Sequence, residues 1–383
     1  MPTNTRNYDV VCVGGGVIGL ITAYELSRQS LSVAVLDKGR IGTEASWAGA
    51  GIISPARRDR ATSPFALLRA VSYDRFPSLA RELAEETGID TGFHQTGGIF
   101  VGRTPQEKAE LDQDRLAWID QGIDHEAWTR EEIESHAPAL APDLSDAFWV
   151  PEVSQVRNPR FLRALIHACE RRGVTLLEGS AVVDFIRQGE RISGVRTTHG
   201  ETFTCGQAVL TAGAWTEGLA RSIGSEVGIR PVQGQIVAVQ TDGTVVPAIT
   251  SLGKRYLVPR RDGLVLIGST EADVGFDVQP SSAAADGLLN FGVSLYPRLA
   301  KGEVVASWAG LRPGSDLGSP IISRDAHWEN VWLATGHFRK GIQLAPATGL
   351  LLADWMRGEE SFVPLGSFDP SADRVQEETG FRS

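Results

Sequence analysis

The segment that most constrains the fold of this chain is Tyr8–Asp37, YDVVCVGGGVIGLITAYELSRQSLSVAVLD. A β-type run, Val10–Val13, comes first, and apolar residues at helical spacing follow from Ile18 to Leu26. A second β-type run, Val33–Leu36, completes the unit. This order predicts a strand–helix–strand unit at the start of an α/β domain.

Three glycines and one acid in this unit have the spacing of a dinucleotide-binding fingerprint. Gly14 permits a tight turn, Gly16 lets the backbone approach a pyrophosphate, and Gly19 lets helix and strand pack closely. The helix N-terminus adds N–H groups and a positive dipole end, which suit phosphate. Asp37 follows the last glycine by 18 residues and can accept hydrogen bonds from a ribose. The segment therefore predicts a bound dinucleotide, which is NAD or FAD.

The composition is that of an ordinary globular protein. The chain has 383 residues, enough for two or three domains, and is 42% hydrophobic and 22% charged. Its net charge of −10 argues against a nucleic-acid partner held by a basic face. Cys12, Cys169 and Cys205 lie far apart without a CxxC pair, so we expect free thiols, the first two buried, in a reducing compartment.

Targeting and metal-binding patterns are not found in the sequence. The seven histidines show no HxxxH or HExxH spacing, so no metal site is predicted. The N-terminal MPTNTRN lacks the apolar stretch of a signal peptide, and no run approaches the roughly 18 apolar residues of a membrane span. We therefore expect a cytoplasmic protein.

Between the fingerprint and the C-terminal third, the chain is expected to leave and re-enter the nucleotide-binding domain. Phe65–Thr87 has a helical pattern, and capping boxes at Thr104 and Thr129 begin two further helices. Asn158 and the proline after it are expected to cap another helix, closed by Gly173. The expected division gives residues 1–88, 151–228 and 309–368 to the FAD-binding or NAD-binding domain, 89–150 and 229–308 to a second, substrate domain, and 369–383 to a tail.

Strand patterns dominate the part of the chain after Gly173. Ala181–Thr204 predicts a meander of short strands, and Gln207–Ala214 predicts a separate buried strand that ends in small residues. Pro231–Val239 and Tyr256–Ser269 predict strands of the second domain.

Two motifs in the C-terminal third carry the remaining chemistry, Trp308–Arg324 (WAGLRPGSDLGSPIISR) and Ala334–Met356 (ATGHFRKGIQLAPATGLLLADWM). Arg312 and Arg339 are expected in glycine-flanked turns, and a guanidinium can donate two parallel hydrogen bonds to a carboxylate. The second motif predicts a strand, a glycine-rich turn and a helix, with the proline of Ala345–Gly349 near the helix start. The N-terminus of that helix, pointed at a flavin, would stabilise negative charge that develops on the ring.

Taken together, the fingerprint, the loop ASWAGAG and the motifs WAGLRPG and GHFRKGIQLAPATG resemble the FAD-dependent D-amino-acid oxidase family, and within it the glycine oxidases of the thiamine pathway. The resemblance spans nearly the whole chain. It implies a two-lobed α/β fold, in which a Rossmann-like FAD-binding domain of the glutathione-reductase type is interrupted by a substrate domain with a mainly antiparallel sheet. It also implies noncovalent FAD, because the last cysteine, Cys205, precedes the C-terminal motifs.

The same resemblance implies roles for individual residues. Arg312 and Tyr256 would clamp the substrate carboxylate, while Arg339 would offer a backbone carbonyl to the substrate amine and positive charge near the site. Each has a plainer interpretation: Arg312 could bond turn carbonyls, Tyr256 could be an ordinary strand residue, and Arg339 could form a surface ion pair. No residue is expected to act as general acid or base, since an amine that binds neutral needs none. The implied cofactor-binding residues are Gly14, Gly16, Val17, Ile18, Gly19, Asp37, Lys38, Ala45, Ser46, Ala50, Gly51, Ile52, Val182, His337, Phe338, Arg339, Lys340, Gly341, Ile342 and Gln343.

Three positions depart from the family pattern. Asp37 stands where glutamate is commoner, and Trp47 is bulky in a stretch usually made of small residues. Glu271 falls where an uncharged residue is common, close to the substrate in relatives. We therefore count it among the candidate substrate-binding residues, where it would favour a cationic substrate; the alternative is that it turns outward to solvent.

The implied reaction is oxidation of glycine, sarcosine or a small D-amino acid. Hydride would pass from the substrate Cα to the flavin, water would hydrolyse the imine to a 2-oxo acid, and oxygen would be reduced to hydrogen peroxide. The imine or glyoxylate would supply thiamine thiazole synthesis, and the family resemblance implies a homodimer or homotetramer. Two alternatives remain: a D-amino-acid dehydrogenase that reduces a quinone, and a flavoprotein that acts on a modified RNA base or binds flavin without turnover. The acidic balance argues against an RNA substrate.

Overall fold

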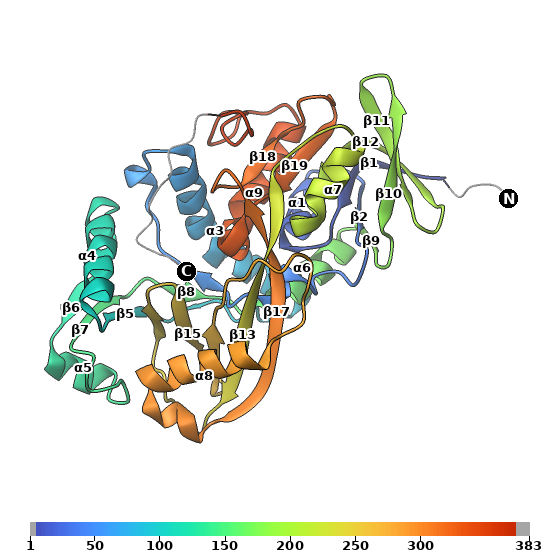
Figure 1. Ribbon diagram of the computed structural model, residues 1–383. Helices are drawn as coiled ribbons and strands as arrows, with labels where there is room; N and C mark the ends of the chain where they lie inside the picture. Colours follow the sequence, from blue (N-terminus) through green and yellow to red (C-terminus); the bar gives the residue numbers. More distant parts are fainter. Residues whose placement is uncertain (1–4, 373–383) are drawn as a thin grey trace.

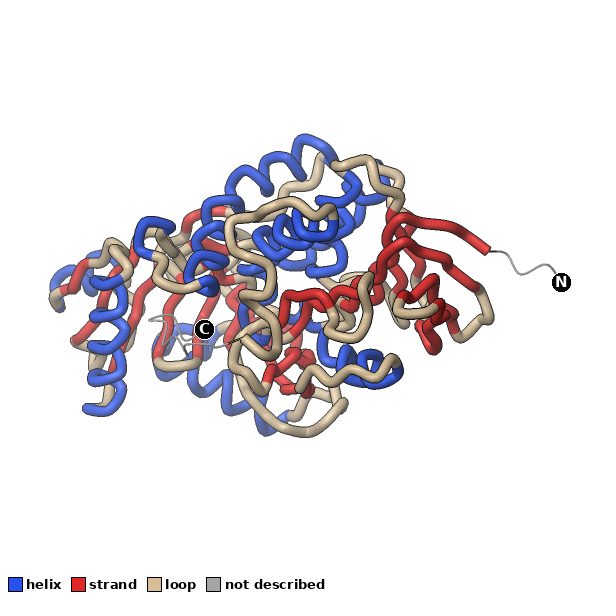
Figure 2. Tube along the Cα trace, turned by 90° about the horizontal axis from the view of Figure 1, so that it is seen from above, coloured by secondary structure: helices blue, strands red, loops and turns tan. Residues whose placement is uncertain are grey.

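The computed structural model of the protein describes residues 5–372, most of whose strands form two large sheets in two lobes (Figure 1). Seen from above, the outline is long, with α4 (Pro105–Asp120) at one end and the N-terminal strand at the other (Figure 2). The first sheet carries the fingerprint, and the second sheet belongs to the lobe that interrupts it.

The centre of the first sheet is parallel. β1 (Thr5–Val13) lies between β2 (Val33–Leu36) and β12 (Thr202–Leu210), with β9 (Thr175–Leu177) beyond β2 and β19 (Val331–Thr335) beyond β12. The predicted strand–helix–strand unit is therefore present, and its two strands are neighbours.

Both faces of this sheet are covered. Val10 and Cys12 of β1 belong to one apolar cluster, while Val11 and Val13 belong to another on the opposite face. Strands buried on both faces are apolar at every position, which explains the continuous runs in the sequence. The helices of the first cluster are α1 (Val17–Ser27), α3 (Pro64–Thr87), α6 (Asn158–Arg171) and α9 (Gly341–Met356), and the other face carries α7 (Thr216–Ser222).

β12 is one continuous strand, so the expected break between a meander and a separate strand from Gln207 is wrong. Its first residues pair antiparallel with β11 (Arg191–Thr197), which pairs with β10 (Val182–Gln188). The ladder to β1 runs along the whole of β12 and carries the strand through Cys205 and Gly206 without interruption. β18 (Ile321–Arg324) completes the sheet beside β19.

α9 begins at Gly341, earlier than the sequence predicts. Pro346 lies inside the helix and does not mark its start. A proline within a helix removes one backbone hydrogen bond, but α9 is buried along almost every residue from Ile342 to Ala353, and that packing outweighs the loss. The turn before it, Phe338–Lys340, is a short 3₁₀ segment.

The second sheet is antiparallel except where β14 (Ile249–Leu252) runs parallel to β5 (Gly98–Gly102). Helix α8 (Ser282–Leu295) packs on it through Leu288 and Leu295. This confirms the predicted α/β class with a mainly antiparallel second sheet. The proposed boundary between residues 308 and 309 falls within β17 (Glu303–Ser315). In spatial order the strands are β17 (Glu303–Ser315), β13 (Ile229–Gln240), β16 (Leu264–Gly268), β15 (Arg255–Pro259), β14 (Ile249–Leu252), β5 (Gly98–Gly102), β7 (Asp146–Val150) and β6 (Glu126–Trp128).

The capping boxes at Thr104 and Thr129 are both formed, at the starts of α4 and α5 (Arg130–His136). Short elements complete the fold: α2 (Ala45–Ala48), the strands β3 (Ile52–Ile53), β4 (His94–Gln95) and β8 (Ser154–Gln155), and 3₁₀ turns at Arg58–Arg60, Gly213–Trp215 and Pro297–Lys301.

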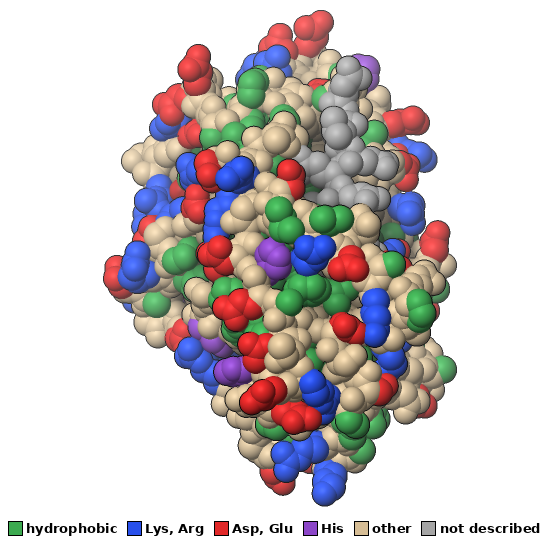
Figure 3. Space-filling model, turned by 90° about the vertical axis from the view of Figure 1, so that its left-hand side faces the viewer, with side chains coloured by type: hydrophobic (Ala, Val, Ile, Leu, Met, Phe, Trp, Pro, Cys, Tyr) green, Lys and Arg blue, Asp and Glu red, His purple; other side chains and the backbone are tan. Residues whose placement is uncertain are grey.

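Cys12, Cys169 and Cys205 are buried free thiols, as expected for the first two. Within residues 5–372 no helix has the length and hydropathy needed to span a bilayer. Acidic and basic side chains are intermingled on the face that Figure 3 presents. The predicted tail begins at Asp369, and most of it lies outside the described residues.

Candidate cofactor and substrate site

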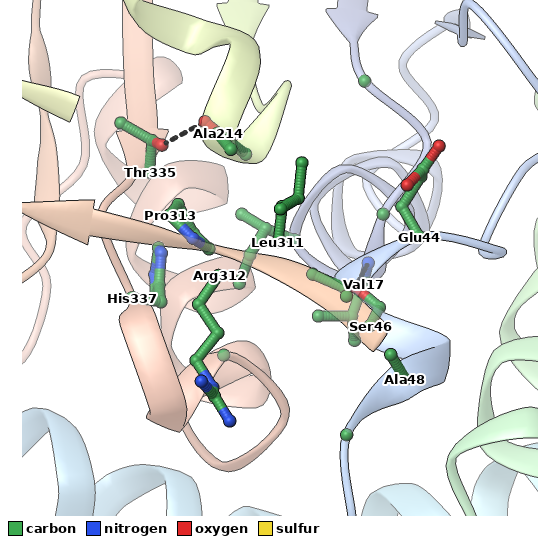
Figure 4. A pocket seen from close by; sticks show the side chains of 18 of the residues that line it. Val17, Glu44, Ser46, Ala48, Ala214, Leu311, Arg312, Pro313, Thr335 and His337 are labelled. Carbon is green, nitrogen blue, oxygen red and sulfur yellow. Dashed lines mark hydrogen bonds between the residues drawn. The ribbon is translucent and has the colours of Figure 1, made fainter. Parts of the chain in front are cut away.

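A cavity of about 430 Å³ lies between the two lobes. On one side it is bordered by the carboxyl ends of β1, β2 and β12 and by the starts of α1 and α9; on the other it is bordered by β13, β15 and β17. Along the chain, strands are added first on one side of β1 and then on its other side. Open α/β sheets bind ligands at such a change in strand order. Figure 4 shows Val17, Ser46 and Ala48 on one side of the cavity and Arg312 and His337 on the other.

The fingerprint glycines fit a nucleotide at this point. Gly14 has φ +118°, and a Cβ there would lie 2.5 Å from the carbonyl oxygen of Thr211. A Cβ on Gly19 would lie 2.0 Å from the carbonyl oxygen of Gly14, so helix and strand meet through this glycine. A Cβ on Gly16 would meet only Ser46, at 3.3 Å, because the cavity lies beside it. The turn and the helix start therefore leave the backbone open to a pyrophosphate.

Asp37 borders the cavity and also braces the turn. Its two carboxylate oxygens accept hydrogen bonds from the backbone N–H groups of Gly15 (2.7 Å) and Gly39 (2.8 Å). Each oxygen has a second lone pair, which leaves the carboxylate able to accept from a ribose hydroxyl as well. Lys38 lies next to it, with its ammonium 3.3 Å from the ring centroid of Trp215, another residue of the cavity wall.

The small-residue loop after the fingerprint is held in place from α6. Ser46 accepts a hydrogen bond from the Val17 N–H (2.9 Å), and its carbonyl accepts one from Asn158 Nδ2 (2.8 Å). The prediction that Asn158 caps the helix is wrong: it lies inside α6, whose N-cap is Arg157. The Asn158 side chain points to the loop and donates to the Ser46 carbonyl, which has no backbone donor in this tight turn.

A buried arginine, which the sequence did not single out, braces the same loop. Arg260 donates to the carbonyl of Ala50 (2.8 Å), to Gln155 Oε1 (2.6 Å) and to the carbonyl of Val156 (3.1 Å). Burial lowers the pKa of Arg260 to about 10, so the guanidinium stays charged at neutral pH. The residues adjacent to Arg260 in the sequence do not show that Arg260, and not Arg261, has this role. The groups that Arg260 contacts are remote from it in the sequence.

The bulky Trp47 does not fill the cavity. It is 38% exposed and lies edge-on to Trp308, with ring centroids 5.3 Å apart. Trp308 donates its indole N–H to the carbonyl of Ala48 (3.0 Å). The contact between the two tryptophans thus links the small-residue loop to β17 outside the cavity.

His337 precedes the turn into α9 and contacts the helix itself. Its Nε2 lies 3.1 Å from the hydroxyl of Thr348, and the ring is buried. Burial lowers the pKa of His337 to about 3. The ring is therefore neutral at physiological pH and acts as a packing and hydrogen-bonding residue.

Replacing His337 by Gln is expected to flatten the acid side of the stability profile. The unfolded chain takes up a proton near pH 6.5, whereas the folded ring stays neutral down to about pH 3, so stability falls as the pH falls through this window. Through this group the wild type should lose at most about 2 kcal/mol between pH 7.5 and 5, and the variant less. Urea unfolding at both pH values measures the difference, and equal losses would contradict it.

Arg312 lies at the second-lobe side of the cavity. It belongs to β17, opposite Val232 of β13, so its predicted place in a turn is wrong. β17 is an edge strand, which is why the next residue can be proline. The guanidinium lies against Gly234, where a Cβ would be 2.1 Å from Nη2.

Within residues 5–372, the hydrogen-bond acceptors of Arg312 are neutral. It donates to Ser269 Oγ (2.8 Å) and to the carbonyl of Thr270 (3.2 Å). The guanidinium is largely buried, which lowers its pKa, and no ion pair within residues 5–372 includes it. A charge held only by neutral groups at the wall of a cavity is suited to an anionic ligand.

Tyr256, Arg339 and Glu271 complete this end of the site. The Tyr256 ring lies over Gly268, where a Cβ would be 2.7 Å from the ring, and it borders the cavity beside Arg312. Arg339 borders the cavity too, and its Nη2 donates to Glu271 Oε2 (2.6 Å). Glu271 is 45% exposed and does not border the cavity.

The structure brings most of the sequence-predicted residues to this one cavity. Gly19, Lys340 and Glu271 are the exceptions among them. The turn Ala212–Trp215 also borders the cavity, but it was not predicted from the sequence as part of the site. The small residues at the end of the strand pattern Gln207–Ala214 could have indicated it. The predicted residues that border the cavity are Gly14, Gly16, Val17, Ile18, Asp37, Lys38, Ala45, Ser46, Ala50, Gly51, Ile52, Val182, Tyr256, Arg312, His337, Phe338, Arg339, Gly341, Ile342 and Gln343.

Comparison with known proteins gives consistent results. Residues 9–355 match the family described as FAD dependent oxidoreductase. The chain is 36% identical to a glycine oxidase of Pseudomonas putida, over 94% of this chain and 98% of that one. It resembles the crystal structure of glycine oxidase from Geobacillus kaustophilus with a TM-score of 0.89 and 33% identity, over 97% of this chain and all of that one. The chain therefore belongs to the FAD-dependent oxidoreductase family, as an amine oxidoreductase of the glycine oxidase type.

Proposed function

We propose that the protein oxidises glycine, sarcosine or a small D-amino acid with oxygen as electron acceptor, and releases a 2-oxo acid, ammonia or an amine, and hydrogen peroxide. The observation that carries the proposal is Arg312, a partly buried cation with neutral partners at the wall of the cavity. A carboxylate is the group that its planar fork binds best. Tyr256 lies beside it and can donate a further hydrogen bond.

The chain's own residues bind and orient the substrate. Arg312 fixes the carboxylate, and this anchoring directs the Cα of a small amino acid toward the turn that precedes α9. FAD, when bound, would supply the hydride acceptor of this oxidation. The N-terminus of α9 borders the cavity at Gly341, Ile342 and Gln343, where its dipole favours negative charge. No side chain of the site is needed as a base for an amine that binds neutral.

Noncovalent attachment of the cofactor is also part of the proposal. None of the three cysteines borders the cavity, and burial raises the pKa of Cys12 and of Cys205 to about 12. A thiol that does not ionise is a poor nucleophile toward a flavin ring. Acid precipitation should release the yellow colour into the supernatant; colour retained in the pellet would contradict this attachment.

The role of the product is proposed from the relatives. The bifunctional protein ThiO/ThiG of Trichormus variabilis is 32% identical over 97% of this chain and 56% of that protein. We infer that the imine or glyoxylate formed here supplies thiamine thiazole synthesis in the cytoplasm. A homodimer or homotetramer remains part of the same proposal.

A substrate panel tests the reaction. Glycine, sarcosine and D-alanine are supplied to the purified holoenzyme in air, and hydrogen peroxide is measured. We expect peroxide in proportion to amino acid consumed. A flavin that is reduced by these substrates yet is not reoxidised by air, and that reduces a quinone dye, would replace the oxidase by a dehydrogenase; no reduction by any of them would contradict the proposed function.

A further inference from the structure

The charges at the substrate end of the cavity do not balance. Arg312 and Arg339 both border the cavity, and each carries one positive charge. Glu271 is the acid in contact with this pair, through its 2.6 Å hydrogen bond from Arg339. The three side chains together leave one positive charge, which is that of Arg312.

The backbone holds Glu271 in this position. The next residue, Ala272, exchanges two backbone hydrogen bonds with Gln233 of β13, at 2.9 and 3.0 Å. Two residues before Glu271, Ser269 accepts a hydrogen bond from Arg312. One short segment therefore contacts both arginines, and the ion pair is in place before any ligand arrives.

The two members of the pair differ in exposure. The Arg339 side chain is 10% exposed, whereas Glu271 is 45% exposed. The hydrogen bond from Arg339 holds the pKa of the Glu271 carboxyl below its usual range, so the acid is ionised at neutral pH. Arg339 thus borders the cavity, and its positive charge is neutralised by the carboxylate of Glu271, the more exposed member of the pair.

We propose that Glu271 restricts the enzyme to amino acids with a single carboxylate, because it occupies the arginine that would otherwise bind a second one. This inference rests on the proposed function and names its substrate class. A monocarboxylate needs only Arg312. A dicarboxylate would bring its second negative charge to Arg339, where Glu271 repels it and competes for the same donor.

Iminodiacetate and its monoamide are the probes. Both present an N-substituted glycine to Arg312, and they differ in whether the far end is a carboxylate or a neutral amide of similar shape. The measured quantity is the ratio of kcat/KM for the diacid to that for the monoamide, which cancels general changes in activity. Glu271→Gln should raise this ratio about tenfold or more, the effect of one hydrogen bond to a charged group.

Asp273 offers a matched control. It lies two residues further along, is 77% exposed and contacts Arg230 at 3.9 Å. Asp273→Asn removes the same charge from the same segment and should leave the ratio unchanged. The double variant Glu271→Gln/Arg339→Gln should return the ratio to near the wild-type value, because the released donor is gone.

The outcomes separate the two proposals. If wild type oxidises sarcosine and Glu271→Gln leaves the ratio unchanged, the inference is wrong and the proposed function stands. An equal rise in Asp273→Asn would also contradict it, since the effect would then be one of overall charge. If Glu271→Gln does not fold, Glu271→Ala serves for the same measurement. If wild type oxidises no amino acid, the proposed function fails first.

Discussion

In the variant Arg312→Ala, kcat/KM for glycine is expected to fall by about 30-fold or more, while the purified protein keeps its flavin. Removing one member of a buried, charge-assisted contact costs about 2–5 kcal/mol, and this arginine is proposed to make that contact with the substrate carboxylate. Arg312 is positioned by Ser269 and Thr270 of the second lobe, away from the fingerprint that is proposed to hold the nucleotide. Peroxide release at several glycine concentrations and the ratio of flavin to protein absorbance measure the two effects.

Two further variants sharpen this experiment. Arg312→Lys keeps the charge without the planar fork and should recover only part of the activity. Arg191→Ala removes an arginine that is 51% exposed and paired with Glu329, and it should behave as wild type. Purification of Arg312→Ala without yellow colour would show that Arg312 serves the cofactor, against the role proposed here.

The largest expected effect on the fold comes from Gly19→Ala. The new Cβ would lie 2.0 Å from the Gly14 carbonyl oxygen and 2.8 Å from Thr211 Oγ1, so α1 must move away from β1. Overpacking of this kind costs typically about 1–3 kcal/mol, and contact with a backbone atom places it at the upper end. We expect a lower melting temperature and loss of most bound FAD.

Gly287→Ala is the matched control. Gly287 lies within α8, far along the chain from the fingerprint, and a Cβ there meets no atom within 4 Å. Alanine should stabilise that helix by about 0.5–1 kcal/mol and leave FAD content unchanged. Thermal unfolding and flavin absorbance compare the two variants. Retention of full FAD content and stability in Gly19→Ala would refute the close approach of α1 and β1.

Sequence reasoning recovered the features that depend on neighbouring residues. The strand–helix–strand unit, the capping boxes at Thr104 and Thr129, and the long helix α3 each follow from local patterns. It failed where contacts between residues remote in sequence determine the local structure. The helical state of Pro346 depends on burial of α9, and the continuity of β12 depends on its ladder with β1.

The site shows the same division. The glycines of the fingerprint could be assigned because each has a local steric reason. Asn158 and Arg260 could not, because their partners in the Ser46–Ala50 loop lie more than 100 residues away. The ion pair of Glu271 with Arg339 could not be predicted either, because the two residues are remote in sequence. The expectation that Glu271 turns toward solvent named no partner for its carboxylate.

The arrangement of β1 has a consequence for how the protein is made. β1 pairs with β12, so that Val10 lies opposite Gln207, and the cavity is completed only by residues as late as Gln343. During synthesis the fingerprint therefore emerges long before the partners that cover it. Such long-range pairing is slow to form and leaves an apolar strand edge exposed meanwhile. The nascent chain must therefore extend beyond Gln343 before the proposed cofactor cavity is complete, so the cofactor is expected to bind late in synthesis or after it.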